Sequence, residues 1–467
     1  MPSSELFLPV QMSRVAVVAP QSRLRDALLL VAEAGSVELV GTLPPAAGET
    51  LEALRRVETA HPETTREPAR LTTSPVDVAG LERAGARGLL AGEVELQRRV
   101  EMARSQGSFS VLVGWAPKER LSDLGDQLAP AGGGVVELRR PSWVDPPTLF
   151  ATTPVRPSFR PLVTTYGVVP YTDVDPTPFA AISFVIMFGI MFGDVGHGIL
   201  LAGLGLAVCR ARTGRLRQFR PFWPFLVAAG ATAAVFGLLY GEAFGPTGLV
   251  PTLWIAPLDE PGRLLVFAVG VGVVLLAISH VYGIVNRWRE SGPGAALLSQ
   301  TGGAGLIMLL GAALAAIGWS TGLQAALVAG GVVAITGTLL LAMGFVLAAG
   351  GGIGILQAAI ELVDAIVRLG SNVLSFTRLA AFGLMHAALG AVVFVAARSL
   401  WGGVVGVVFA TAVFVFGNAI AFSLELLVTA VQALRLEFYE LFSRVFEGEG
   451  HPFQPWTLPV TPTKEEL

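Results

Sequence analysis

Two long apolar segments toward the C-terminal end of the chain carry residues that can move ions. Arg378 and His386 stand among Leu, Ala, Phe and Val in the first segment, and Glu425 and Arg435 stand in the second. An ionised side chain at membrane depth costs several kcal/mol, so such residues point to a functional site. Histidine and glutamate can exchange protons near neutral pH, whereas a guanidinium keeps its charge. The combination predicts a relay of titratable groups interrupted by a fixed cation.

Polar residues recur at intervals of seven along both segments. The two series are Asp364, Ser371 and Arg378 in the first segment, and Asn418, Glu425 and Gln432 in the second. Seven residues make nearly two helical turns, so each series lies on one helix face with a drift of about 20° per step. Each helix therefore presents a polar stripe, which we expect to face protein or water instead of lipid.

The composition is that of a membrane protein. Of 467 residues, 53% are hydrophobic and 14% charged, whereas about a quarter are charged in soluble domains. The formal net charge is −3 and there is no basic tail, so nothing predicts a nucleic-acid partner. Cys209 is the single cysteine, which excludes an intrachain disulfide framework and a multi-cysteine metal site.

Residues 1–165 contain nearly all of the soluble-type sequence and are expected to form one domain. Strand–helix–strand patterns in 15–41 and 108–140 predict a small α/β domain of ferredoxin-like type. No glycine-rich phosphate loop follows the first strand of either pattern, so we expect a docking domain without a nucleotide cofactor. The N-terminus lacks the basic flank and apolar core of a signal peptide, which predicts that this domain is cytoplasmic.

Residues 166–467 are expected to form an α-helical polytopic membrane domain with about eight transmembrane helices, the last two long and tilted. The apolar run 179–209 would be ~46 Å long as one helix, against a hydrocarbon core of ~30 Å. The glycine-rich stretch 193–198 interrupts it, so we interpret the run as two short spans. Five arginines in 209–220 predict a cytoplasmic loop, and an even number of spans places the C-terminus in the cytoplasm.

The direction of travel assigns a depth to each charged residue. The seventh span leaves the cytoplasm, so Asp364 lies near the inner side and His386 toward the outer side. The eighth span returns, so Glu425 lies nearer the outer face and Arg435 nearer the inner one. We expect His386 and Glu425 to line an outer path and Asp364 an inner one, with Arg378 between them holding a carboxylate. No acid of the membrane part is free to be that carboxylate, so a partner protein must supply it.

Structural interpretations of these residues stay open. His386 can donate to a neighbouring carbonyl, and Asp364 can be a solvated acid at the interface. Glu425 and Arg435 can form a structural ion pair across helices.

The helix break at 193–198 contains Asp194 and His197, which we expect to fix the backbone there. One acid and one histidine three residues apart, without further ligands nearby, do not predict a metal site. The sequence assigns no role to Asp194, His197 or Glu242 beyond this.

Several motifs resemble the membrane stator subunit of V/A-type rotary ATPases, called subunit a or subunit I. These motifs are YTDVDPTPF (171–179), MFGDVGHG (191–198), YGEAFG (240–245) and SFTRLAAFGLMHAALG (375–390), with GWAPKERL (114–121) and DPPT (145–148) before them. The resemblance covers most of the chain. It implies that Arg378 is the essential arginine of the family, and that Asp364, His386, Glu425 and Arg435 are its other ion-path positions.

The resemblance also implies a function and a set of partners. A ring of proteolipid subunits would rotate past this chain while its carboxylates load and unload protons or sodium ions between two half-channels. The chain would then be a non-catalytic subunit in the plasma membrane of a bacterium or archaeon, assembled with peripheral stalk subunits, central stalk subunits and a soluble ATPase head among membrane lipids. The N-terminal domain resembles the family's stalk-docking arm but is shorter. Members of the family usually carry a long coiled coil in this arm, and here only 79–105 could supply a fragment of it.

A self-contained secondary transporter is the alternative from a different class. Such a protein needs its own substrate cavity and usually paired broken helices. Only one break, at 193–198, is evident in the sequence. Co-purification distinguishes the two hypotheses. A secondary transporter is active alone, whereas a stator subunit should co-purify with small proteolipids and soluble ATPase subunits.

Overall fold

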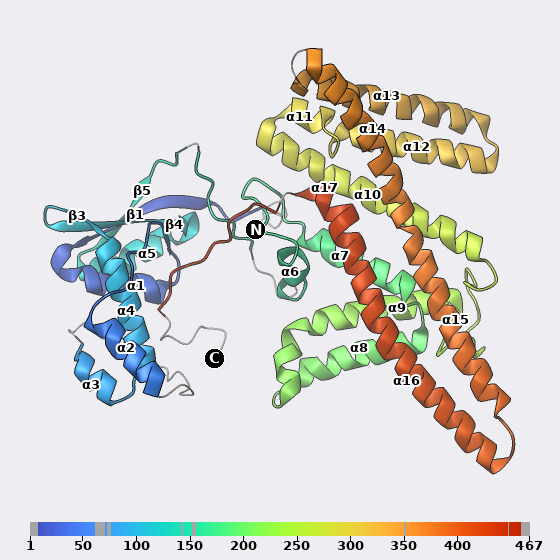
Figure 1. Cartoon of the computed structure of the whole chain (residues 1–467), viewed down its shortest axis with the longest axis horizontal. Helices are drawn as coiled ribbons and strands as arrows, with labels where there is room; N and C mark the ends of the chain where they lie inside the picture. The colour runs from blue at the N-terminus through green and yellow to red at the C-terminus, as the bar shows by residue number, and fades with distance from the viewer. Residues whose placement is uncertain are drawn as a thin grey trace. The chain divides into compact units, whose positions relative to one another are not determined.

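The computed structural model describes residues 8–60, 71, 76–141, 143–151, 156–349, 352–446 and 448–458. They divide into two compact units. Among the described residues, one unit is formed by 9–150 together with 450–458, and the other by Leu8 together with 151–449. The first contains all the strands labelled in Figure 1, and the second is helical.

The first unit is an antiparallel sheet with helices packed against it. Its strands are β1 (Met12–Pro20), β2 (Glu38–Leu39), β3 (Arg104–Gln106), β4 (Phe109–Pro117) and β5 (Gly134–Leu138). Its helices are α1 (Leu24–Ala34), α2 (Glu49–Ala60), α3 (Val78–Arg83), α4 (Arg87–Met102) and α5 (Leu121–Leu128). The strand order is β2-β4-β1-β5, with β3 pairing β4 outside this path. A small sheet domain in the N-terminal part is therefore confirmed.

The core of this unit follows from the apolar patterns of its central strand and first helix. Val15 and Val17 of β1 are buried against Leu28 and Val31 of α1, which lie three residues apart on one helix face. Helix α1 ends at Gly35, whose φ of 52° is left-handed, as at many helix C-termini. The strands expected around 15–20 and 108–117 are present as β1 and β4, and the helix expected after the first of them is α1.

The second unit consists almost entirely of helices. In chain order they are α6 (Arg156–Thr164), α7 (Thr177–Met191), α8 (Val195–Arg210), α9 (Trp223–Tyr240), α10 (Pro261–Ser291), α11 (Pro293–Leu298), α12 (Gly303–Thr321), α13 (Gln324–Ala349), α14 (Gly352–Ser375), α15 (Thr377–Ser399), α16 (Gly403–Leu436) and α17 (Ser443–Val445). A 3-10 turn, Arg215–Phe222, precedes α9, and a π-helical turn, Glu437–Phe442, joins α16 to α17. The mostly helical, multi-pass class is confirmed.

Six helical segments of the described residues are long and apolar enough to cross a membrane. They are Arg215–Tyr240, Pro261–Ser291, Pro293–Thr321, Gln324–Ala349, Ile355–Ser399 and Gly403–Val445. Helices α7 and α8 are also apolar but shorter, with 15 and 16 residues, and they are separated at 192–194, where the sequence predicts a break. The last two segments have 45 and 43 residues. At 1.5 Å per residue each is roughly 65 Å long, about twice the hydrocarbon core.

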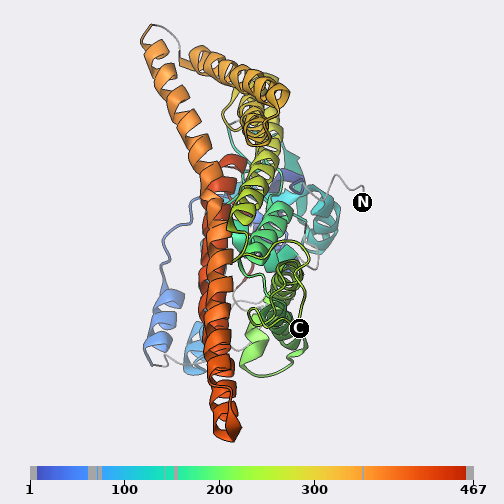
Figure 2. The same cartoon turned by 90° about the vertical axis from the view of Figure 1, so that its right-hand side faces the viewer.

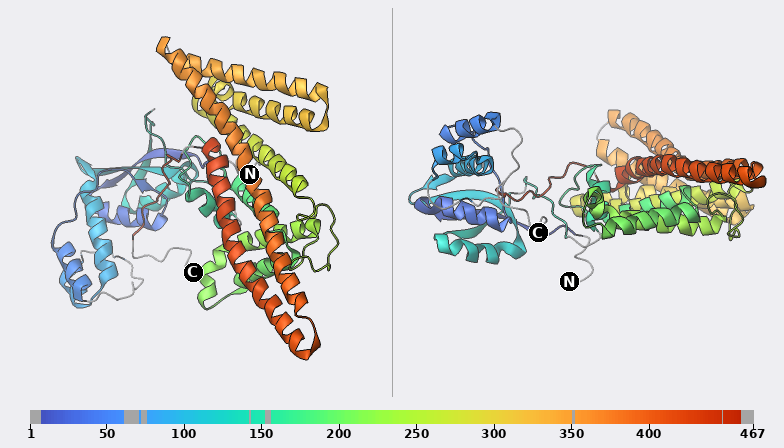
Figure 3. Two further views of the ribbon diagram at one scale, coloured as in Figure 1. Left: turned by 45° about the vertical axis from the view of Figure 1, so that its right-hand side comes forward. Right: turned by 90° about the horizontal axis from the view of Figure 1, so that it is seen from below.

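Helices α14, α15 and α16 run along one side of the helical unit (Figure 2). Seen from below, α15 and α16 form a layer over α7, α8 and α9 (Figure 3). Helices α8 and α9 approach closely at Gly198 and Gly230, since a Cβ on Gly198 would lie 2.5 Å from the amide nitrogen of Ala234. Such contacts are typical of membrane helices. They hold the start of α8 against its neighbours and so position the polar residues described next.

Candidate functional site

Asp194 begins helix α8 and holds the helix break in place. Its Oδ1 accepts a hydrogen bond from the amide of His197 (2.8 Å), and its Oδ2 accepts one from the amide of Gly245 (3.0 Å). These are the N–H groups that a helix start and a tight loop leave unpaired. The loop reaches Asp194 because Phe244 adopts a left-handed φ of 55°, which is unusual for a bulky residue. Asp194 therefore fixes the break, as predicted.

His386 and Glu425 meet between the last two long helices. His386 Nδ1 of α15 forms a hydrogen bond with Glu425 Oε2 of α16. Both side chains are buried, at 5% and 2% exposed. The antiparallel course of the two helices predicts that these residues converge, and they do. Glu425 thus takes a histidine as its partner, and not the arginine of the structural alternative.

Polar side chains from other elements surround this pair. We call Asp194, His197, Glu242, His386, Asn418 and Glu425 the outer cluster. All six are buried. In the described part of the chain, four buried atoms of this cluster have no hydrogen-bond partner: both ring nitrogens of His197, Oδ1 of Asn418 and Oε1 of Glu425. Because buried polar atoms are normally paired, these four atoms are candidates to bind water or an ion.

The linear sequence did not reveal this cluster as a whole. Asp194 and His197 have no further ligand near them in sequence, yet the fold brings His386 beside them, with ring centroids of the two histidines 5.6 Å apart. The expectation that no further ligand lies nearby is therefore wrong. It failed because the third residue comes from a helix almost 200 positions away, and no spacing rule connects the two.

A second cluster surrounds Arg378, near the start of α15. Arg378 Nη1 lies 3.4 Å from Glu440 Oε1, and its Nη2 lies 3.4 Å from Ser375 Oγ. Charge-assisted pairs are usually 2.7–2.9 Å long, so the guanidinium is loosely held. Its side chain is 27% exposed, whereas that of Glu440 is 6% exposed. The charge of Arg435, which is itself exposed, also acts on Glu440. We call Ser375, Arg378 and Glu440 the inner cluster.

Glu440 is the main functional candidate that the sequence pattern missed. Continuing the series Asn418, Glu425 and Gln432 by seven reaches Tyr439, which is 71% exposed. The π-helical turn at 437–442 adds a residue to the helix and shifts the stripe by one position. Glu440 therefore continues the buried polar face. The seven-residue spacing would have led to Glu440 only if the sequence had also indicated the π-helical turn.

Glu437, in the same turn, is fully buried and receives a hydrogen bond from Ser183 Oγ of α7, which lies 2.9 and 2.8 Å from its two carboxylate oxygens. This contact ties the end of α16 to the first apolar helix. The sequence gives no sign of this contact, because neither residue belongs to a recognisable pattern.

Asp364 lies apart from both clusters. Its side chain is 49% exposed, and its Oδ2 pairs with Arg368 Nε at 2.6 Å on the same helix. Asp364 and Arg378 are fourteen residues apart, which is about 21 Å along a helix. The structure thus brings His386 to Glu425 and Glu440 to Arg378, but it brings Asp364 to neither cluster.

The motif 171–179 organises the chain just before α7. Asp175 accepts a hydrogen bond from the amide of Thr177 (2.9 Å) and pairs with Arg156 (3.2 Å). Burial, together with the neighbouring carboxyl group of Glu290, raises the pKa of Asp173 to about 7. These contacts anchor the entry to the first apolar helix, so the motif has a structural explanation here.

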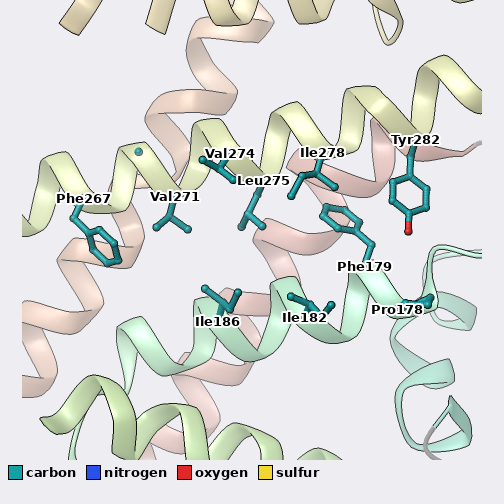
Figure 4. Close-up of a pocket in the computed structure, with 11 residues that line it drawn as sticks. Pro178, Phe179, Ile182, Ile186, Phe267, Val271, Val274, Leu275, Ile278 and Tyr282 are labelled. Atoms are coloured by element: carbon teal, nitrogen blue, oxygen red, sulfur yellow. The ribbon is translucent and has the colours of Figure 1, made fainter. Parts of the chain in front are cut away.

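A cavity of about 730 Å³ lies between α7 and α10, and none of its lining residues belongs to either cluster (Figure 4). Side chains such as Phe179, Ile182 and Ile186 from α7 face Val274 and others from α10 across it. Among its described lining residues, only a tyrosine at one end is ionisable. This cavity therefore offers no relay of groups for an ion.

The fold and the two clusters define a class of protein: a multi-pass helical membrane protein with ionisable groups buried between its spans. Residues 98–246 match the model of the V-type ATPase 116kDa subunit family. Curated relatives include the A-type ATP synthase subunit I of Pyrococcus horikoshii, 24% identical over 369 residues (76% of this chain and 54% of the relative), and that of Thermococcus kodakarensis, 26% identical over 391 residues (78% and 56%). A V-type ATP synthase subunit I 2 of Treponema pallidum is 40% identical over 96 residues, 21% of each chain.

These matches confirm the resemblance to the subunit I family of V/A-type ATPases that the motifs indicate. The chain spans about half the length of the curated archaeal relatives that it matches.

Proposed function

We propose that this chain is the membrane stator subunit of a V/A-type rotary ATPase. It would form two half-paths for protons or sodium ions and hold Arg378 against the carboxylates of a rotating proteolipid ring. The observation that carries the proposal is the state of Arg378: a permanent charge on a membrane-spanning segment, partly exposed and held by contacts of 3.4 Å. A guanidinium in that state is available to a carboxylate from outside the chain.

The two clusters supply the half-paths. Arg378 and His386 are eight residues apart on α15, so the inner and outer clusters are separated by about 12 Å along the helix. In the outer cluster, Glu425 and His386 can pass a proton between them. In the inner cluster, Glu440 can exchange protons with the opposite side of the membrane. Asp364 and Arg435 line the approach to Glu440 from that side. Arg378 blocks direct passage, because it cannot give up its proton.

The surface of α14–α16 supports docking of a ring. Large apolar side chains that the described chain leaves exposed there include Ile360, Val367, Leu374, Phe416, Ile420 and Leu427. Apolar surface of this extent on membrane helices suits either lipid or other apolar helices. Leu374 lies one helical turn before Arg378, so a ring helix seated there brings its carboxylate to the guanidinium.

The finer architecture belongs to the same proposal. We infer eight spans, with α7 and α8 as a short pair joined at the break, and a cytoplasmic location for both termini. We propose that residues 1–165 are the arm that docks to peripheral stalk subunits and that 166–467 are the ion-translocating domain. Central stalk subunits and an ATPase head are the other proposed partners. The sheet order β2-β4-β1-β5 supports the ferredoxin-like assignment of the arm, because split strand–helix–strand units interleave their strands in this way.

Purification tests the assembly. The chain, tagged in its native host, is expected to bring down small proteolipid subunits and soluble ATPase subunits in mild detergent. The purified chain alone, placed in lipid vesicles, is expected to transport nothing, because it lacks the ring carboxylate. Transport by the isolated chain would favour the secondary-transporter alternative and contradict the proposal.

Glu440 is expected to compete with the ring carboxylate for Arg378. In a Glu440→Gln variant, Arg378 holds the ring carboxylate longer, so ATP-driven transport should fall about tenfold, which corresponds to about 1.4 kcal/mol of barrier. Tyr439→Phe, a change at its exposed neighbour, should leave the rate unaltered. Both rates are measured on the assembled complex in vesicles. Equal rates for Glu440→Gln and the parent would show that Glu440 does not act on Arg378.

A further inference from the structure

His197 is the least satisfied buried side chain of the outer cluster. It is 2% exposed, and neither of its ring nitrogens has a hydrogen-bond partner in the described residues. The side chain of Asn418 lies beside the ring, close enough to interact with it, but not in hydrogen-bonding geometry. Leaving a buried polar group unpaired costs free energy, because the group loses its hydrogen bonds to water and gains none in the protein. Two free nitrogens on one buried ring therefore indicate a ligand that the protein itself does not provide.

Asp194 and His386, which lie beside His197, carry side chains of the types that bind metal ions. One ligand atom from each of Asp194, His197 and His386 lies within 4.8 Å of the others. Two imidazoles and a carboxylate are ligands that suit zinc and similar divalent transition metals. Tetrahedral zinc, with bonds of about 2.0–2.1 Å, places its ligand atoms about 3.4 Å apart. To bind such an ion, the three ligand atoms must approach one another from separations of up to 4.8 Å.

Hydrogen bonds to other groups orient two of the three ligands, and the ring of the third, His197, packs among aromatic side chains. The bond from His386 Nδ1 to Glu425 leaves Nε2 of His386 for a metal, which is the carboxylate–histidine–metal arrangement of many zinc sites. Asp194 is held by the amides of His197 and Gly245. An aromatic shell surrounds His197, with the rings of Phe192, Phe244 and Phe422 at centroid distances of 5.8, 5.4 and 5.5 Å.

We propose that Asp194, His197 and His386 form a binding site for one divalent transition-metal ion of the zinc class, with the fourth position left to water and Glu425 orienting His386. The site depends on these ligands and not on rotary function. If the proposed function also holds, a bound metal occupies the outer half-path and stops transport.

The other described histidines do not offer such a site. His280 Nε2 lies 3.0 Å from Arg444 Nη1, and its Nδ1 lies 2.7 Å from the carbonyl of Leu276. A guanidinium at that distance repels a second cation. His451 is exposed and pairs with Glu38. The free cysteine, Cys209, is at the far end of α8 and can be removed as a source of background binding.

Metal binding by the purified full chain tests the site directly. In a Cys209→Ser background, Co²⁺ is expected to bind once per chain with the visible absorption of a tetrahedral centre, and Zn²⁺ is expected to displace it. His197→Ala, and the closer substitute His197→Gln, should weaken binding at least about tenfold, and Glu425→Gln should weaken it about 10–100-fold through His386. His451→Ala should bind as the background does.

Folding is checked for each variant by gel filtration and thermal unfolding, and binding is scored only for variants that match the background. Unchanged affinity in the His197 variants, or no stoichiometric binding by the folded background chain, overturns the site. Transport does not enter this measurement, so its outcome and that of the rotary proposal are separate.

Discussion

Replacing Arg378 by alanine is expected to abolish ATP-driven ion transport by the assembled complex, with a loss on the order of 100-fold or more, as for removal of a preorganised charged donor. Without the guanidinium, nothing draws the ring carboxylate out of its neutral, ion-loaded form, and the barrier between the two half-paths is lost. Arg378→Lys is expected to fail as well. An ammonium is a compact point charge that cannot match a carboxylate at two points, and Ser375 and Glu440 are placed for the longer fork.

Ion uptake and ATP hydrolysis are measured on the same vesicles, after the ring and the ATPase subunits are shown to be present. Arg398→Ala is the matched control, because Arg398 is an exposed arginine on the same helix, near its far end. The control should transport at the parental rate. Normal pumping by either Arg378 variant would exclude the proposed mechanism.

Glu425→Gln is expected to slow transport by about tenfold or more, equivalent to at least about 1.4 kcal/mol, and to change its dependence on pH. Glutamine fills the same space, but it cannot take up a proton and cannot stabilise a charged His386. The relay across α15 and α16 then loses one of its two titratable members. The pH profile is the sharper readout, because a merely structural loss lowers the rate at every pH alike.

The profile is recorded by varying pH on the outer side of vesicles that carry the complex. Glu260→Gln is a suitable control, since Glu260 is an exposed acid that pairs with Arg263 outside the cluster. It should keep the parental profile. A Glu425→Gln complex with the parental pH profile would show that Glu425 lies off the ion path.

Much of the membrane part could be predicted from local sequence. The seven-residue spacing identified the polar face of α16, and Asn418 and Glu425 are both buried there. The direction of the last two spans was enough to bring His386 to Glu425. The helix break at 193–198 was predictable because glycine and a capping aspartate carry their own backbone signals.

The remaining features depend on contacts between distant segments. Glu440 reaches Arg378 only because a π-helical turn shifts the stripe by one residue, which heptad counting cannot detect. The rings of His197 and His386 meet because the fold brings the start of α8 close to α15, an approach between segments far apart in the sequence. For Asp364, the regular spacing was misleading. It predicted that Asp364 lies on the same helix face as Arg378, but Asp364 pairs with Arg368 on its own helix and joins neither cluster.

Disulfide cross-linking to the ring tests most directly whether Arg378 meets a rotating carboxylate. In a Cys209→Ser background, a cysteine at Leu374, 65% exposed and one turn before Arg378, is paired with a cysteine beside the carboxylate of the proteolipid. A cysteine at Ile335 on α13, 61% exposed, is the control. The account predicts a stator–ring cross-link from Leu374→Cys and none from Ile335→Cys. A cross-link from α13 alone, or none from Leu374→Cys in the assembled complex, would contradict it.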